Sequence, residues 1–327
     1  MKSKKAVHDA AAFLCRLSDS FALLTLLASI VTLLASYHWI ADLLANLRVQ
    51  QSMAVLVVFV LCLFCRRWLW TAILGLCLLN HAWWFAAPVS TDSKHATMDG
   101  DLSITFANVL TANKSYEAII PDLFADEPDV IVIVELSSVL ADRLKAKMSA
   151  THPFTTLYTE DRGNFGIGLV SRYPLANIDR FTLNTDIQSI AATIQLPRGR
   201  SVRLFATHPL PPIGESNFRL RNEQLTLLAA RIKAFTSKQA GTPIVLVGDF
   251  NLTPWSPHFN DFQSATRLQR VGSRFDLTPT WYHYPLFPFG LVIDHVMISS
   301  DIVCSEHRIG RLTGSDHRRV SVVVDVN

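Results

Sequence analysis

The sequence predicts an α/β domain of packed β-sheets with outer helices, preceded by three apolar, membrane-spanning helices. Two observations lead to this fold class. The 327-residue chain is 50% hydrophobic and only 17% charged, whereas a soluble protein carries about 25% charged residues, so an apolar segment dilutes the count. From residue 101 onward, apolar runs of strand length alternate with amphipathic helical patterns and short turns, which favours packed mixed sheets over a purely parallel one.

Composition excludes several other classes of protein. High hydrophobicity with a net charge of only +3 excludes an intrinsically disordered chain. With 13 Gly and 15 Pro and no internal repeat, collagen-like and low-complexity classes are excluded as well. Five cysteines in 327 residues do not build a disulfide scaffold. Cys304 alone follows residue 92, and we expect it to be a buried small hydrophobe.

Three uncharged stretches within residues 1–91 are expected to be a membrane anchor of three transmembrane helices. They cover about residues 20–41, 49–65 and 68–89. A bilayer core of about 30 Å needs roughly 20 apolar residues in a helix, with 17 near the lower limit, so the second stretch qualifies narrowly. A cleaved signal peptide explains the first stretch less well, because its apolar segment is too long. Buried core helices remain the alternative.

The positions of the basic residues predict the orientation of this anchor. One side of the predicted spans holds Lys2, Lys4, Lys5, Arg16, Arg66 and Arg67, whereas the other short loop holds Arg48 alone. Because cytoplasmic loops are enriched in Lys and Arg, the N-terminus and the Arg66–Arg67 turn should be cytoplasmic. Three spans from an inside N-terminus then place the chain from residue 92 onward outside the cytoplasm.

Residues 92–100 are expected to be a polar linker, and residues 101–327 are long enough for one large domain. The predicted strands cover residues 102–107, 130–134, 166–170, 202–206, 244–247, 292–298 and 320–326. The predicted helices cover residues 115–124, 138–148 and 217–235. The last of these repeats apolar residues at helical spacing, which predicts an apolar face formed by Leu220, Leu225, Leu228 and Ile232.

Polar residues stand at the ends of the predicted strands, where a rigid scaffold presents a site. They are Asn108, Glu135, His208, Asp249, Asn251, Asp294, His295, Asp316 and His317. Acid oxygens suit a hard cation such as Mg²⁺, and a histidine oriented by an acid can contact phosphate or transfer a proton. The sequence has no thiolate or His-x-x-x-His spacing that would indicate zinc. The set therefore predicts phosphate chemistry with a bound cation.

In this order, the motifs resemble those of the endonuclease/exonuclease/phosphatase superfamily. That superfamily includes pancreatic deoxyribonuclease, abasic-site endonucleases, inositol-polyphosphate phosphatases and neutral sphingomyelinases. The matching positions are Asn108, the Val-Glu-Leu around Glu135, and residues 168–174, 207–209, 248–251, 293–295 and 315–317. With its apolar N-terminus the chain resembles a membrane-anchored bacterial branch. The resemblance implies a four-layer α/β sandwich, two mixed sheets face to face with helices outside, in the periplasm and anchored in the bacterial inner membrane.

The resemblance also implies a metal site formed by Asn108, Glu135 and Asp316. These residues would hold Mg²⁺, with Mn²⁺ as a possible substitute, and Asn108 would orient the ligands rather than bind directly. Glu135 is the strongest candidate, since an ionised acid that closes a run of apolar residues needs compensation. The alternatives are a helix-capping role for Glu135 and a turn-forming role for Asn108.

Five further residues carry implied catalytic roles. Asp249 would orient or deprotonate the attacking water, and Asn251 would hydrogen-bond the phosphate oxygens. His317 would contact the phosphate or move a proton, held by Asp294, and His208 would be a second histidine beside the phosphate. Whether Asp249 or His317 is the base stays open. An Asx turn at residues 249–251 and a satisfied loop histidine at 208 are the structural alternatives.

Three other features have weaker functional readings. Strand alternation should point the His295 side chain away from that of Asp294, so His295 is left out of the site, and Arg172 is expected to be structural. The aromatic run at residues 281–290 would lie at the rim of the site. It could contact lipid, stack on a base or sugar, or pack under the loop.

Together these features predict a membrane-anchored, Mg²⁺-dependent phosphoesterase in which an activated water attacks phosphorus in line. The expected partners are the lipid bilayer and a phosphoester substrate, and no obligate protein partner is evident. Nucleic acid and phospholipid or lipid-linked substrates both stay open, because the net charge near −1 after residue 91 gives no electrostatic support for a nuclease. The alternative is a catalytically inactive, membrane-tethered binding module, which the retained Asp-x-Asn and Asp-His pairs disfavour.

Overall fold

The computed structural model describes residues 2–88, 90–91, 102–273, 275–283 and 289–326. It divides into two compact units, which meet in the chain between Ala87 and Pro88. The predicted linker, residues 92–100, lies outside the described residues. The two residues before it, which share its polar composition, form strand β1 (Ser90–Thr91) of the second unit.

The first unit contains helices α1 (Lys2–Thr32), α2 (Trp39–Asn46), α3 (Arg48–Phe64) and α4 (Trp68–Ala86). Among the described residues, two helical segments are long and apolar enough to cross a membrane, Phe13–Thr32 and Trp68–Ala86. Helices α2 and α3 meet at 72° and form a third candidate if they count as one span. The stretch at 20–41 is thus divided, since α1 ends at Thr32 and turns at residues 33–37 precede α2.

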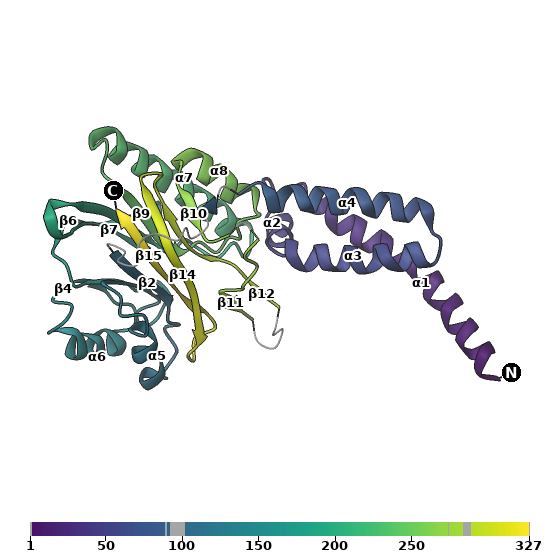
Figure 1. Ribbon diagram of the computed structural model, residues 1–327, viewed down its shortest axis with the longest axis horizontal. Helices are drawn as coiled ribbons and strands as arrows, with labels where there is room; N and C mark the ends of the chain where they lie inside the picture. The colour runs from purple at the N-terminus through teal and green to yellow at the C-terminus, as the bar shows by residue number, and fades with distance from the viewer. Residues whose placement is uncertain (1, 89, 92–101, 274, 284–288, 327) are drawn as a thin grey trace. The chain divides into compact units, whose positions relative to one another are not determined.

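A disulfide between Cys15 and Cys65 joins α1 to the end of α3, a bond that the sequence did not lead us to expect. Beside it, the Arg67 guanidinium pairs with the Asp19 carboxylate at 3.3 Å and donates to the carbonyl of Cys15 at 3.4 Å. Helix α1 therefore meets the α3–α4 turn at the end where Arg66 and Arg67 lie, and it continues past this junction toward the N-terminus (Figure 1).

The second unit is built on two mixed β-sheets. The seven-stranded sheet has the order β1-β10-β13-β9-β8-β7-β6, with β6 (Leu175–Thr182), β7 (Gln188–Gln195), β8 (Ser201–Thr207), β9 (Ile244–Asp249), β10 (Gln269–Val271) and β13 (Asp294–Ile298). The six-stranded sheet has the order β14-β15-β2-β3-β5-β4, with β2 (Leu102–Asn108), β3 (Val130–Val134), β4 (Phe154–Tyr158), β5 (Ile167–Ser171), β14 (Ile302–Leu312) and β15 (Arg318–Val326). A short ribbon pairs β11 (Trp281–Tyr282) with β12 (Gly290–Leu291).

Helices cover the outer face of each sheet and complete the four predicted layers (Figure 1). Helices α5 (Tyr116–Leu123) and α6 (Ser138–Met148) pack on the six-stranded sheet. Helices α7 (Glu215–Lys238) and α8 (Pro257–Thr266) pack on the seven-stranded sheet. The α/β sandwich expected from the sequence is therefore confirmed.

The uninterrupted apolar strands explain this layering, because successive side chains of a strand point to opposite faces. In β3, Val130, Val132 and Val134 enter the core between the sheets, while Ile131 and Ile133 pack under α5 and α6. A strand that is apolar on both faces requires cover on both sides. On α7, Leu225, Leu228 and Ile232 are buried against the sheet as the helical spacing predicts, whereas Leu220 is only half-buried.

Candidate active site

The strand directions bring the polar strand ends to one edge of the sandwich. Strand β2 runs parallel to β3 and β8 parallel to β9, so their carboxyl ends, with Asn108, Glu135, His208 and Asp249, lie at matching edges of the two sheets. Strand β13 runs antiparallel to β9 and starts there, with Asp294 opposite Asp249. Strand β15 runs antiparallel to β2 and begins directly after His317.

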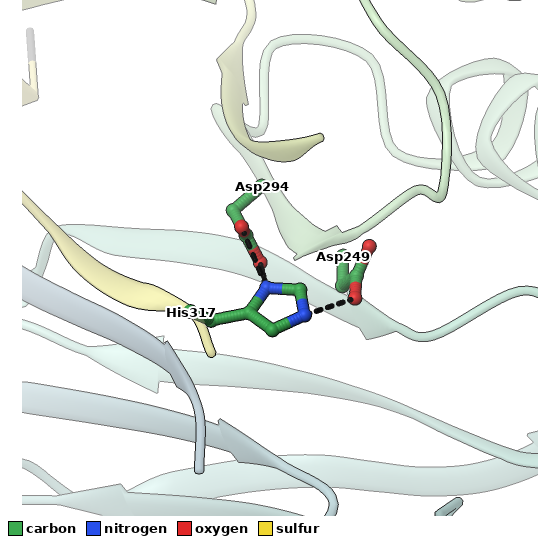
Figure 2. A group of neighbouring side chains, drawn as sticks. All are labelled: Asp249, Asp294 and His317. Atoms are coloured by element: carbon green, nitrogen blue, oxygen red, sulfur yellow. Dashed lines mark hydrogen bonds and ion pairs between the residues drawn. The ribbon is translucent and has the colours of Figure 1, made fainter. Parts of the chain in front are cut away.

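The imidazole of His317 lies between the carboxylates of Asp249 and Asp294 (Figure 2). Its Nδ1 is 2.9 Å from Asp294 Oδ2 and 3.1 Å from Oδ1. Its Nε2 is 3.6 Å from Asp249 Oδ2. All three side chains are buried. Both oxygens of Asp294 contact Nδ1, which fits a proton on Nδ1, and Nε2 is the atom that faces the site.

This arrangement shifts the pKa values of both Asp249 and His317. Burial, reinforced by the charge of Asp294, raises the pKa of Asp249 to about 7 even though His317 opposes the shift. Burial alone would lower the pKa of His317, but the Asp294 and Asp249 carboxylates outweigh it and raise the pKa to about 10. The two groups face each other, so their protons belong to one coupled equilibrium. Both groups therefore hold a proton more tightly than they would in water, and His317 is the more basic of the two.

The side-chain amide of Asn108 connects the two halves of the site. Its Nδ2 donates to Glu135 Oε1 at 2.8 Å and to Asp249 Oδ2 at 3.1 Å, and it lies 3.3 Å from His317 Nε2. Its Oδ1 accepts the backbone N–H of Leu110 at 3.1 Å, which fixes the orientation of the amide. Asn108 thus holds two acids together from the end of one strand, and its amide packs against the ring of His317.

Glu135 follows β3 in a left-handed backbone conformation, with φ of 57°. The Thr111 hydroxyl donates to its carbonyl oxygen at 3.1 Å, and the Thr111 N–H lies 3.4 Å from its Oε2. Burial raises the pKa of Glu135, although His208 and the Asn108 hydrogen bond act against the shift. Further hydrogen-bond donors to this carboxylate, or a bound cation, would favour its charged form.

Asn251 also has a left-handed backbone, with φ of 50°. Its N–H donates to Asp249 Oδ1 at 2.9 Å, which forms the Asx turn given above as the alternative reading of this motif. Its side-chain Nδ2 donates to the carbonyl of Pro209 at 3.0 Å. An amide NH₂ has two hydrogens, so this bond still leaves Asn251 one donor for a phosphate oxygen. Turn formation and ligand binding are compatible in this residue.

His208 lies on the other side of Asp249 from Asp294. Its Nε2 is 3.5 Å from Asp249 Oδ2, and its ring lies 5.3 Å from that of Phe165. Burial lowers the pKa of His208 to about 4, despite the opposing charge of Glu135. The site therefore contains one neutral and one protonated imidazole near neutral pH.

Asp316 is held by a different partner from the other two residues of the predicted metal site. Its Oδ2 accepts the indole N–H of Trp281 at 2.9 Å, and among the described residues it has no hydrogen bond to Asn108 or Glu135. A different trio, Asp249, Asp294 and His317, offers ligand atoms within 4.8 Å of one another. Because Asp294 already binds His317 Nδ1 with both oxygens, this trio is better suited to proton chemistry than to holding a cation.

His295 and Arg172, which were left out of the predicted site, make structural contacts. The ring of His295 is buried beside Phe250 and Phe259, and its Nε2 lies 2.8 Å from the carbonyl of Leu252. Arg172 pairs with Asp129 at 2.9 Å. In the aromatic run, residues 284–288 lie outside the described residues, so only its ends are placed.

Three supporting residues had no role assigned from the sequence, although Ser315 belongs to the matching motif at residues 315–317. Thr111 braces Glu135, as described above. Ser315 donates from its hydroxyl to the carbonyl of Asn108 at 2.8 Å and accepts the N–H of His317 at 3.0 Å. The hydroxyl of Thr280 accepts the N–H groups of both Ile293 and Asp294 at 3.1 Å. The Ser-x-His spacing is a possible signal for Ser315, but Thr280 acts at a distance in the chain that no local pattern reveals.

Comparison with known proteins relates the chain to one family. The model of the "Endonuclease/Exonuclease/phosphatase family" matches residues 105–317, a span that includes every candidate site residue. No curated protein matches the chain.

Solved structures agree with this match at the level of the fold. An endonuclease/exonuclease/phosphatase from Beutenbergia cavernae is 19% identical over 70% of this chain and 72% of its own, with a TM-score of 0.57. TDP2 of D. rerio, complexed with a single-strand DNA product, is 16% identical over 70% of this chain and 100% of its own, with a TM-score of 0.57. A mannosyl-6-phosphatase from Bacteroides thetaiotaomicron is 18% identical over 68% of this chain and 99% of its own, with a TM-score of 0.53.

Proposed function

This chain belongs to the endonuclease/exonuclease/phosphatase family of phosphoester hydrolases, and we propose that it is a membrane-anchored enzyme that hydrolyses a phosphodiester or phosphomonoester with the help of Mg²⁺. The observation that carries the proposal is His317, buried between Asp249 and Asp294, with Asp249 linked through Asn108 to Glu135. A binding module without activity has no need of this coupled acid–histidine arrangement. The substrate is a nucleic acid or a phospholipid or lipid-linked phosphoester.

The residues present fit a hard cation in the predicted place. Glu135 is a buried carboxylate, which is costly to keep charged without a partner of opposite charge. Asp316 Oδ1 is buried and has no hydrogen-bond partner among the described residues. Carboxylate and amide oxygens are the ligands that Mg²⁺ prefers. Glu135 and Asp316 would hold the cation, Asn108 would orient Glu135, and the bound cation would neutralise charge on the phosphate.

The pKa shifts support Asp249, rather than His317, as the general base, a choice that the sequence left open. Asp249, with a pKa raised to about 7 by burial and by Asp294, is matched to a general base near neutral pH. It would accept the proton of a water whose oxygen attacks phosphorus as the ester P–O bond breaks, and the leaving oxygen would take a proton from solvent. His317 keeps its proton and would contact the phosphate oxygens through Nε2, while Asn251 would donate its remaining amide hydrogen to the same oxygens.

The substrate class can be tested with the full chain in detergent micelles. With Mg²⁺ present, we expect hydrolysis of at least one of plasmid DNA, phospholipid vesicles and inositol phosphates, and we expect EDTA to abolish it. Release of cut DNA or of soluble phosphate is the measurement. Phosphate-ester binding without turnover on any of the three, with or without Mn²⁺, would support the inactive binding module instead.

The placement of the domain outside the cytoplasm rests on the basic residues around the helices. Alkaline phosphatase fused after Thr91 in a bacterial host should be active, and a fusion after Arg67 should be inactive; the reverse result would contradict the placement. The Cys15–Cys65 pair gives a second readout, because thiols are kept reduced in the cytoplasm. If Arg67 is cytoplasmic, both cysteines should be reduced in intact cells and react with a membrane-permeant alkylating agent, and the disulfide of the structure should form only on oxidation. A disulfide already present in intact cells would contradict the placement.

A further inference from the structure

The short strand β11 and the residue before it lie across the two sheets at the site. The hydroxyl of Thr280 accepts the N–H of Asp294 at 3.1 Å, at the start of β13 in the seven-stranded sheet. The carbonyl of Thr280 accepts the N–H of Arg318 at 2.7 Å, at the start of β15 in the six-stranded sheet. Trp281 forms an isolated bridge with His317. Thr280 and Trp281 therefore tie together the two strands that supply the Asp294–His317 pair.

Trp281 adds a side-chain bond to this backbone connection. Its indole Nε1 donates to Asp316 Oδ2 at 2.9 Å, and the neighbouring Tyr282 N–H donates to the carbonyl of Asp316 at 2.9 Å. A bond from a neutral donor to a carboxylate is charge-assisted and stronger than one between neutral groups. The same carboxylate leaves its Oδ1 buried and without a hydrogen-bond partner among the described residues. Asp316 is thus fixed through one oxygen and open at the other.

We propose that Trp281 is a positioning residue of the cation site, whose indole N–H holds Oδ2 of Asp316 and leaves Oδ1 as the oxygen available to the cation. The inference rests on the proposed function, in which Asp316 is a cation ligand. Trp281, the first residue of the aromatic run, would then have a role other than contacting lipid, stacking on a substrate or packing under the loop. The polar edge of the indole is engaged with Asp316, and the ring stacks on His283 at 5.8 Å and 26°.

The physical effect of this bond is to restrict rotation of the carboxylate. An Asp carboxylate rotates broadly about its last side-chain bond, so an unrestrained Asp316 would have to be ordered when the cation binds. A partner in the outer shell removes that cost in advance, and losing such a partner typically lowers metal affinity or activity by about 10–100-fold. Trp281→Phe keeps an aromatic ring and removes the N–H donor. Replacement with 3-benzothienylalanine, which has sulfur in place of the N–H, keeps almost the whole shape.

The test measures Mn²⁺ binding directly, by the electron paramagnetic resonance signal of free Mn²⁺ titrated with the full chain in detergent. We expect both Trp281 variants to raise the dissociation constant at least about tenfold, with native circular dichroism. Their hydrolysis should recover toward the wild-type kcat at high Mn²⁺ concentration, because the cation, once bound, is held by the same oxygens. The matched control is His283→Ala, which removes the stacked ring and leaves the indole donor, and which should bind Mn²⁺ within twofold of wild type.

Asp316→Asn distinguishes failure of the inference from failure of the proposed function. If Asp316→Asn weakens Mn²⁺ binding but the benzothienylalanine variant does not, Trp281 has no positioning role and the metal-dependent mechanism stands. If His283→Ala weakens binding as much as Trp281→Phe, packing of the aromatic pair rather than the indole N–H is responsible, and the inference is overturned. A wild-type chain that binds no Mn²⁺ would instead contradict the proposed function.

Discussion

His317→Ala is expected to lower kcat at least about 100-fold, the usual scale for a positioned group that takes part in proton transfer or charge stabilisation. The alanine removes the protonated Nε2 that faces Asp249 at 3.6 Å and the Nδ1 that binds Asp294 at 2.9 Å. Asp294→Ala should cost somewhat less, since Asp294 acts through His317. For the same reason the double variant should be little slower than His317→Ala alone.

A second histidine–acid pair supplies the control for this cycle. His307 Nδ1 lies 3.6 Å from Asp276 Oδ2, in a half-buried pair that contributes nothing to the candidate site. His307→Ala should therefore leave kcat close to wild type. This control shows what the loss of a histidine–acid pair costs when the pair lies outside the site. Additive losses in the His317 and Asp294 variants would show that the two residues do not act as a pair. An active His317→Ala enzyme, folded by circular dichroism, would overturn the mechanism.

Glu135→Gln is expected to raise the Mg²⁺ concentration for half-maximal activity at least about tenfold. Loss of an outer-shell partner alone typically costs about 10–100-fold, and this variant removes the charge of a proposed direct ligand. The amide retains an oxygen that can still accept from Asn108 Nδ2, so the 2.8 Å bond and the fold should be preserved. Activity and circular dichroism are measured across a Mg²⁺ titration.

Glu117→Gln is the matched control, because Glu117 is an exposed acid on α5 that pairs with Arg143 at 3.3 Å. Its Mg²⁺ titration should coincide with that of the wild type. If Glu135→Gln also leaves activity and the titration unchanged, Glu135 does not belong to the metal site, and its carboxylate serves only to hold Asn108 and Thr111.

The strands that could be predicted are uninterrupted apolar runs. Strand β7, although largely buried, contains Ser189 and Thr193 among its apolar residues and was not predicted. Val130–Val134 forms β3 with the predicted bounds, because an unbroken apolar run must be covered on two sides. Strands β6 and β14 were not predicted either. Phe181 is the one buried residue of β6, and in β14 exposed and half-buried polar residues break the apolar run. A single sequence carries little signal for such edge strands, whose pairing depends on neighbours far along the chain.

In the candidate site, too, residues could be identified from the local sequence, whereas contacts between residues distant in the chain could not. Asn108, Glu135 and Asp249 were identified because each closes a buried strand, and the strand directions then bring them within hydrogen-bond reach. The bond from Trp281 to Asp316 and the Cys15–Cys65 pair span 35 and 50 residues. Neither follows from spacing, because the fold alone decides which distant side chains meet.

The left-handed backbones of Glu135 and Asn251 (φ of 57° and 50°) set stability against activity at the centre of the site. Such a conformation in a residue other than glycine costs of order 1–3 kcal/mol, and here it is sustained by Thr111 and by the turn to Asp249. That free energy comes from the folded domain rather than from the substrate. A sequence selected only for a more stable fold would place glycine at these positions, and it would lose the two side chains proposed to bind the cation and the phosphate.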